Sequence, residues 1–385
     1  MTHTNPGTDS AVGTRHSRAH FELAGTTPRE LGRARGLALR DTIDAAYRGY
    51  AAIFRAVGVS EAAERESAAA SFAAVEAWRP EIAEELRAVA DASGLALDRL
   101  MALNARTEIL ALGNAPAHEC STVSIRLGGA MHSVQTWDWH ADLAEFWHTQ
   151  TVTGDGAAGS RAAGGGETAG GAHPRPNYRF AGITEQGILA KIGLNEAGLA
   201  VNFNILGHAA DGPGGVSVHL LAYAVLRECA NVDEAIALVR ATPVSASTSL
   251  TLTDAGGAVS LEVTPVGVFE VPLREGVLIR TNHLQHSTPL REQKASYEPD
   301  SSERFDLLEQ RIEACRPADL TALVALLESG EGDPPLSCVA DPAMPLGDRW
   351  ATLATVVMSP AERRIRVLDG MPTGAATGAW REFTL

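Results

Sequence analysis

Cys120 and Asp138 are the residues whose types and positions best suit nucleophilic chemistry. Apolar and polar residues alternate over 121–127, and a second strand is expected over 132–139 after a glycine turn. Pairing these strands about Gly129 places residues whose numbers sum to 258 opposite each other. The spacing therefore predicts that Cys120 lies beside Asp138, so that a thiol stands next to a carboxylate.

A thiol at this position needs a base, because the thiolate is the nucleophile and a free cysteine has a pKa of about 8.5. One candidate base is a histidine, as in papain-like enzymes, but no CGxCW context surrounds Cys120. The other is the α-amine that cleavage between Glu119 and Cys120 would free, with a pKa of about 7.7 to 8.0. The junction of a helical segment with a β layer favours the amine. A plain buried cysteine at a strand start is the alternative.

Histidines and tryptophans around this strand pair suggest no other chemistry. His132, His140 and His148 recur every eight residues, but the strand is not continuous and no carboxylate spacing completes a metal site. Trp137 is expected in the core or the pocket wall rather than in a platform for stacking bases. We therefore expect neither a metal nor a cofactor.

The elements that must position Cys120 change character at that residue. Residues 1–18 are polar and aperiodic and are expected to form a disordered tail. Residues 19–119 have helical periodicity, starting with a capping box at Thr27-Pro28-Arg29-Glu30. Residues 120–385 contain antiparallel strand pairs and grouped helices, with a flexible Gly/Ala-rich insertion at 154–173. Grouped rather than alternating helices predict α+β layers in one globular domain.

Composition limits the partners. The chain has 385 residues, 45% of them hydrophobic, so a large core is available. Its 32 basic and 47 acidic residues give a net charge of −15, which argues against nucleic acid. No stretch reaches the roughly 18 apolar residues of a membrane span, and residues 1–18 lack the apolar core of a signal peptide. We expect a soluble, cytoplasmic protein that acts on a small molecule, without a membrane partner.

Seven segments, in this order, strengthen the prediction of a freed amine. They are GTTPRELGRARG (25–36), LNARTE (103–108), ECSTV (119–123), QTWDW (135–139), KIGLNEAGLAVNFN (191–204), TNHLQH (281–286) and PLS (335–337). In type, order and spacing they resemble the penicillin acyltransferase family, the isopenicillin N acyltransferase type of N-terminal nucleophile hydrolase, from about residue 21 to 370. The resemblance implies a four-layer αββα sandwich and self-cleavage before Cys120.

The resemblance also implies roles for individual residues. Cys120 matches the self-cleaving nucleophile, Asp138 the aspartate of the Trp-Asp motif, and Asn282 the oxyanion donor of the TNH motif. Further positions are expected to line the pocket or to support the site: Trp137, Asn202, Asn204, Arg106, Glu108 and Ser337. For Asn202 and Asn204, hydrogen bonds to backbone at a strand end are an equal alternative. Arg106 and Glu108 are expected to pair, chiefly in support of the fold.

Three positions depart from the pattern. Glu119 stands where a glycine is usual, so self-cleavage is expected to be slower. Ser337 lacks the basic residue that follows it closely in relatives. Gln135 replaces an arginine of the related bile salt hydrolases, which argues against a bile salt substrate.

We predict an amidohydrolase that cleaves a small acylated amide through an acyl-thioester, while the two fragments stay associated through apolar helix faces. The alternative in the same fold is an N-acyltransferase that uses a coenzyme A thioester. The alternative from another class is an unprocessed scaffold or binding protein.

Overall fold

The computed structural model describes residues 18–113, 120–154, 175–290 and 300–385. Of the predicted tail (1–18), the structure describes only Arg18. Of the predicted insertion (154–173), it describes only Gly154. Glu119 and the remaining residues of the tail and the insertion lie outside the described residues.

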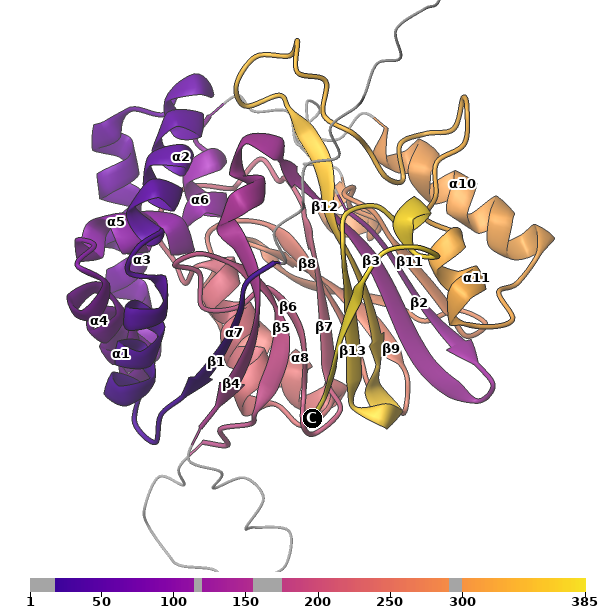
Figure 1. Ribbon diagram of the computed structural model, residues 1–385, viewed down its shortest axis with the longest axis horizontal. Helices are drawn as coiled ribbons and strands as arrows, with labels where there is room; N and C mark the ends of the chain where they lie inside the picture. Colours follow the sequence, from indigo (N-terminus) through magenta and orange to yellow (C-terminus); the bar gives the residue numbers. More distant parts are fainter. Residues whose placement is uncertain (1–17, 114–119, 155–174, 291–299) are drawn as a thin grey trace, which may run out of the picture.

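Two sheets form the centre of the molecule (Figure 1). Within the described residues, the larger sheet has eight strands, in the order β1 (His20–Ala24), β4 (Trp147–Thr153), β5 (Phe180–Glu185), β6 (Ile192–Asn195), β7 (Ala200–Ile205), β8 (Thr248–Thr253), β9 (Ala258–Thr264) and β10 (Gly267–Pro272). The smaller has six, in the order β11 (Val277–Arg280), β2 (Ser121–Leu127), β3 (Ala130–His140), β12 (Trp350–Ser359), β13 (Arg364–Asp369) and β14 (Trp380–Thr384).

Alternation of side chains along the strands separates the two faces of each sheet. On β7, Asn204 points to the smaller sheet, where it meets Thr122, whereas Phe203 stacks on His219 of α7 (Val218–Glu228). On β2, Val123 belongs to a second apolar cluster on the opposite face from Thr122. Polar side chains thus lie between the sheets near Cys120, and apolar ones face the helices.

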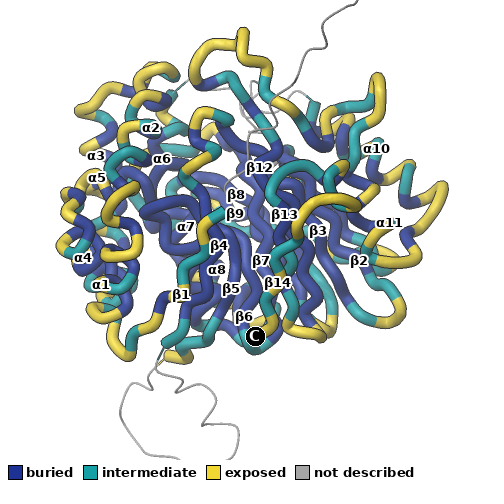
Figure 2. The backbone as a smooth tube through the Cα atoms, in the orientation of Figure 1, coloured by how far each residue is buried: buried dark blue, intermediate teal, exposed yellow. Residues whose placement is uncertain are grey.

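Helices cover both outer faces. α7 and α8 (Val232–Arg240) pack on the larger sheet, and α10 (Ser301–Ala314) and α11 (Leu320–Ala325) cover the smaller one through Leu308 and Leu323. This is the predicted four-layer αββα sandwich. Figure 2 shows the central strands of both sheets buried, whereas exposed residues lie mostly on the outer helices and loops. None of the helices in the described ranges combines the length and apolarity needed to cross a bilayer.

A group of helices flanks the sandwich at one side (Figure 1). Its members are α1 (Pro28–Leu39), α2 (Ile43–Ala56), α3 (Glu61–Trp78), α4 (Pro80–Ser93), α5 (Leu97–Asn104) and α6 (Arg106–Leu110). α1 begins at the predicted capping box: Thr27 Oγ1 accepts from the Glu30 backbone N–H at 3.2 Å, and a Glu30 carboxylate oxygen accepts from that of Thr27 at 3.3 Å.

The remaining elements are short connections. They are α9 (Ser287–Leu290) and the 3₁₀ turns η1 (Ala141–Phe146), η2 (Pro360–Glu362) and η3 (Pro372–Gly374). One strand was not expected: β1 lies in the segment predicted to be helical and pairs in parallel with β4. Its partner is more than 120 residues away, so local periodicity carries no sign of it.

Candidate active site

The β2–β3 hairpin carries Cys120 and Asp138 in a register one residue away from the predicted one. Its ladder runs from Leu127↔Ala130 to Ser121↔Thr136, so paired numbers sum to 257. The turn contains two residues, Gly128 and Gly129, with φ of +56° and +90°, as a type I′ turn requires. Continuing the ladder would place Cys120 opposite Trp137, and the predicted pairing with Asp138 is wrong.

Cys120 is nevertheless close to Asp138. Its side chain is buried, and Sγ lies 4.0 Å from the backbone oxygen of Asp138. Thr122 and Ser124, at the alternating positions that follow, both reach the larger sheet, Thr122 through Asn204 at 2.9 Å and Ser124 through Thr253 at 3.0 Å. The same alternation directs the thiol toward the space between the sheets.

Asn204 and Arg304 hold the carbonyl group of Cys120. Asn204 Nδ2 donates to Cys120 O at 2.8 Å, and Arg304 Nη1 donates to the same oxygen at 3.3 Å. The other end of the Asn204 amide is fixed as well, because Oδ1 accepts from the Thr122 hydroxyl at 2.9 Å. Two sheets and one helix thus fix the backbone immediately after the predicted cleavage point.

Arg304 is a site residue that the sequence reasoning missed. It is buried on α10 and also donates to Ser121 Oγ at 3.1 Å and to Asn282 Oδ1 at 3.3 Å. A signal did exist: Arg304 shares the buried face of α10 with Leu308 and Ile312, at steps of four. A buried arginine on an apolar face requires polar partners.

Asn282 follows β11 and is joined to Cys120 through Arg304. Its Nδ2 donates to Ile205 O at 3.0 Å, and its backbone N–H donates to Ser301 Oγ at 2.7 Å. The predicted oxyanion donor is therefore fixed near the nucleophile, with its amide engaged to a backbone carbonyl.

Asp138 is a buried carboxyl group with one open oxygen. Burial raises its pKa to about 6, although a hydrogen bond from Thr352 and the positive charge of Arg304 lower it. Among the described residues, Oδ1 has no hydrogen-bond partner. Because a buried oxygen without a donor is unfavourable, the atom is suited to receive a polar group that the described part of the chain does not supply.

The side chain of Asn202 helps to link two strands, whereas that of Asn204 contacts Cys120. Its Nδ2 donates to Gln135 Oε1 at 3.1 Å. Gln135 in turn bonds both backbone groups of Phe203, at 2.7 and 3.2 Å, and so links β3 to β7. Trp137 meets Trp147 edge-on, with 5.8 Å between ring centroids.

Arg106 and Glu108 have separate partners. Arg106 donates to Glu185 at 2.7 Å, and Lys191 donates to the same carboxylate oxygen at 3.3 Å. Glu108 Oε1 accepts from the Val218 backbone N–H at 2.8 Å, at the first turn of α7. Burial raises the pKa of Glu108 to about 7. Both residues join the flanking helices to the sandwich.

Ser337 lies in a loop packed against β3. Its backbone N–H donates to Ser329 Oγ at 3.1 Å, and the carbonyl of the preceding Leu336 accepts from Thr136 at 3.0 Å. The next residue, Cys338, donates its backbone N–H to Thr352 Oγ1 at 2.9 Å. Burial, reinforced by the charge of Asp138, raises the pKa of the Cys338 thiol.

Comparisons with known proteins give relatives over most of the chain. The family described as acyl-coenzyme A:6-aminopenicillanic acid acyl-transferase matches residues 134–373, more than half of the chain. The acyl-coenzyme A:6-aminopenicillanic-acid-acyltransferase 40 kDa form of Emericella nidulans is 25% identical over 295 residues, which cover 76% of each protein.

Two kinds of solved structure are similar. Penicillin V acylase from Agrobacterium tumefaciens has a TM-score of 0.45 and 17% identity, covering 69% of this chain and 86% of that one. A variant of conjugated bile acid hydrolase from Clostridium perfringens has a TM-score of 0.46 and 12% identity, covering 69% and 92%.

Proposed function

Because the chain belongs to the acyl-coenzyme A:6-aminopenicillanic acid acyl-transferase family, we propose that it is a self-processing enzyme in which Cys120 becomes the first residue of the catalytic fragment. At the coarser level, it is an enzyme of acyl transfer or amide hydrolysis that acts on small acyl substrates. The observation that carries the finer proposal is the pair of donors, Asn204 and Arg304, on the Cys120 carbonyl.

Processing begins with the Cys120 thiol. It attacks the carbonyl carbon of Glu119, the Glu119–Cys120 amide bond breaks, and the thiol proton passes to the departing nitrogen. Water then hydrolyses the thioester and leaves a carboxylate on Glu119, a free thiol and a free α-amine. The donors on the Cys120 carbonyl support this step, because they hold the backbone of Cys120 in place while its thiol approaches the carbonyl carbon of Glu119.

Turnover reuses the same sulfur. The thiol attacks the substrate carbonyl while the α-amine takes its proton, and the amine returns the proton to the leaving nitrogen. Asn282 donates to the developing oxyanion, and Asp138 Oδ1 accepts from the α-amine and orients it. Water, or an amine, then accepts the acyl group from the thioester.

Hydrolysis of a small N-acyl compound is our preferred reaction, since excluding water from an acyl-thioester demands a specially closed pocket. Acyl transfer from a coenzyme A thioester is the second candidate, favoured by the name of the Emericella nidulans relative. Membership of an enzyme family argues against the third prediction, an unprocessed scaffold.

Trapping the acyl-enzyme tests this proposal. The wild type, incubated with a panel of N-acyl amines and N-acyl amino acids and quenched in acid, is expected to gain the mass of one acyl group on Cys120. Parallel reactions with an acyl-coenzyme A donor and a free amine distinguish transfer from hydrolysis. Cys120→Ala is the control. Acylation of another residue, or turnover by the alanine variant, would overturn the proposal.

A further inference from the structure

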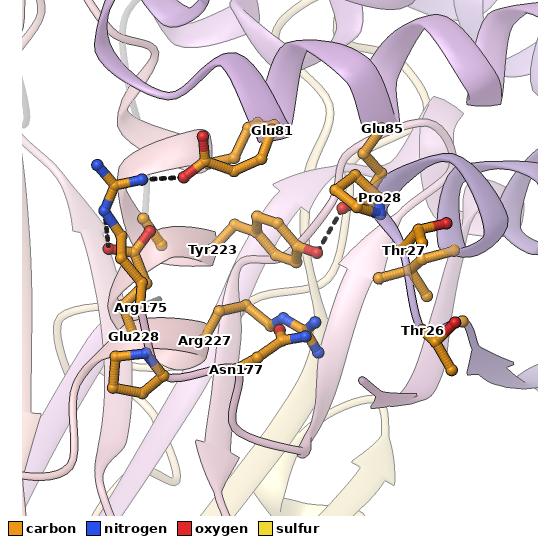
Figure 3. Close-up of a pocket in the computed structure, with 15 residues that line it drawn as sticks. Thr26, Thr27, Pro28, Glu81, Glu85, Arg175, Asn177, Tyr223, Arg227 and Glu228 are labelled. Carbon is orange, nitrogen blue, oxygen red and sulfur yellow. Dashed lines mark hydrogen bonds and ion pairs between the residues drawn. The ribbon is translucent and has the colours of Figure 1, made fainter. Parts of the chain in front are cut away.

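A pocket of about 510 Å³ lies between the flanking helices and α7 (Figure 3). Its walls come from the start of α1, from α4, from α7 and from the segment 175–177. α7 covers the outer face of the larger sheet, whereas Cys120 lies against the inner face. The larger sheet therefore separates this pocket from the candidate active site.

Every carboxylate in the pocket wall already has its own partner. Glu85 is buried and accepts from the Tyr223 hydroxyl at 2.6 Å and from Arg35 Nε at 3.4 Å. Glu228 pairs with Arg79 at 3.1 Å. The third carboxylate, Glu81, pairs with Arg175, which also approaches Glu228.

Arg227 is the surplus cation of this wall, that is, the charge that no carboxylate of the described residues balances. Its exposed fraction is 7%, and no carboxylate of the described residues lies within ion-pair distance of it. Its Nη1 donates to a neutral group, the Tyr178 carbonyl, at 3.3 Å. A guanidinium that is nearly removed from water and has no counter-ion among the described residues favours an anion beside it.

Arg227 Nη2 and the side-chain amide of Asn177 lie close to each other beside the backbone of Gly154. A Cβ placed on Gly154 would lie 2.8 Å from Arg227 Nη2 and 2.2 Å from Asn177 Nδ2. Figure 3 shows the two side chains meeting in the pocket. The planar guanidinium of Arg227 can by itself bind both oxygens of a carboxylate.

Part of the pocket wall is apolar. Leu31, Ile82 and Ala224 line the pocket together with Pro28 and the ring of Tyr223. The volume is typical of small-molecule sites, which combine apolar walls with a few convergent polar groups. The ligand must therefore carry an apolar body as well as a charged end.

We propose that this pocket binds a small monocarboxylate with an apolar body, whose carboxylate pairs with Arg227. A single surplus cation matches a single negative charge, and the guanidinium fork matches the two carboxylate oxygens. A dianionic phosphate would lack a second cation and would face Glu85 and Glu228. The bound molecule would bridge α1 and α4 to α7, and would stabilise the contact between the flanking helices and the sandwich. The site does not use Cys120 and does not depend on the proposed reaction.

Calorimetric titration with octanoate tests the proposal, with octanol and inorganic phosphate as comparison probes. The wild type is expected to bind octanoate, and its Tm to rise with octanoate concentration. Neither octanol nor inorganic phosphate is expected to bind there. Absence of octanoate binding, or equal binding of phosphate, would refute the assignment.

Two variants localise the binding. Arg227→Gln removes the cation, and Asn177→Asp places a competing carboxylate beside Arg227 without changing the size of the side chain. Each is expected to weaken octanoate binding by about tenfold or more. Arg240→Gln is the matched control, because Arg240 is an exposed arginine paired with Glu270 outside the pocket. If Arg227→Gln fails to fold, Asn177→Asp still decides: octanoate affinity equal to that of the wild type would contradict the proposed site.

Discussion

At the scale of single residues, the site combines two features. Hydrogen bonds hold the Cys120 carbonyl, and one oxygen of the Asp138 carboxylate has no hydrogen-bond partner among the described residues. The sequence motifs located Cys120, Asp138 and Asn282, which are joined by contacts along one end of the sheets. Arg304, which connects Cys120 to Asn282, is not predicted, because these two partners lie more than 20 residues away from it in sequence. Residue types can be recognised from a motif, but which side chain completes their hydrogen bonds depends on the packing of α10.

Asn204 is predicted to position Cys120 for processing. Asn204→Ala removes a donor from the Cys120 carbonyl and should slow self-cleavage by up to about tenfold, the effect of one hydrogen bond. The time course of chain splitting after synthesis in vitro measures this rate. Asn202→Ala is the matched control, because the same residue type two positions away bonds Gln135 instead. Equal slowing of both variants would show a general effect of sheet damage.

Asp138 is predicted to make stability depend on pH. Its pKa is about 6 in the folded protein and close to 3.9 in an unfolded chain, so the folded state favours the protonated form. The resulting stabilisation is complete below about pH 4 and is lost as the pH rises through 6, by about 3 kcal/mol. Asp138→Asn lacks this loss and should gain stability relative to the parent as the pH rises.

The stabilities of the parent and of Asp138→Asn are compared with Cys120→Ala present in both proteins, so that both remain single chains. Urea unfolding at pH 4.5 and pH 7.5 gives the difference in free energy of unfolding between parent and Asp138→Asn. A difference independent of pH would mean that the aspartate is not raised in pKa in the folded protein.

At the scale of elements, the sequence predicts best those features that depend on a few consecutive residues. The capping box at Thr27 depends on four consecutive residues and was predicted correctly. The register of β2 and β3 depends on the number of residues in the turn, and a sequence with adjacent glycines allows loops of two or three residues. β1 could not be found, because its stability comes from β4 and not from its own five residues.

The glycine pair should respond differently to two substitutions. Gly129→Ala forces an alanine to a φ of +90° and should lower the free energy of unfolding by about 1 kcal/mol or more. Gly128→Asn should be neutral or slightly stabilising, because asparagine tolerates the φ of +56° in a type I′ turn. Apart from its chain neighbours, no described atom lies within 4 Å of either added Cβ. Steric contacts therefore do not contribute to the difference in stability between the two variants. Equal effects of the two changes would argue against the two-residue turn.

At the scale of the whole molecule, a buried ionic cluster joins residues 1–119 to the rest of the chain. Glu185 on β5 pairs with Arg106 of α6 and with Lys191, and accepts from Tyr50 of α2. Trp139 donates to the same tyrosine hydroxyl at 2.7 Å. These contacts, with the apolar faces of the helices, would keep the two fragments associated after cleavage.

Removing the anion of this cluster should weaken that association. Glu185→Gln removes the carboxylate that Arg106 and Lys191 share and should cost about 3 to 5 kcal/mol of stability. Size-exclusion chromatography in increasing urea, after processing, should show the fragments separating at a lower urea concentration than in the wild type. Glu270→Gln is the control, since that carboxylate forms an exposed ion pair with Arg240. Separation at the same urea concentration as the wild type would exclude the cluster as a link between the fragments.

The intact mass of the purified, active protein tests the central claim most directly. Self-cleavage gives two polypeptides, residues 1–119 and residues 120–385, the second beginning with a free Cys120 amine. Cys120→Ala is expected to be one unbroken chain of about 40.5 kDa, without activity. An active wild type whose peptide bond before Cys120 is intact would contradict it.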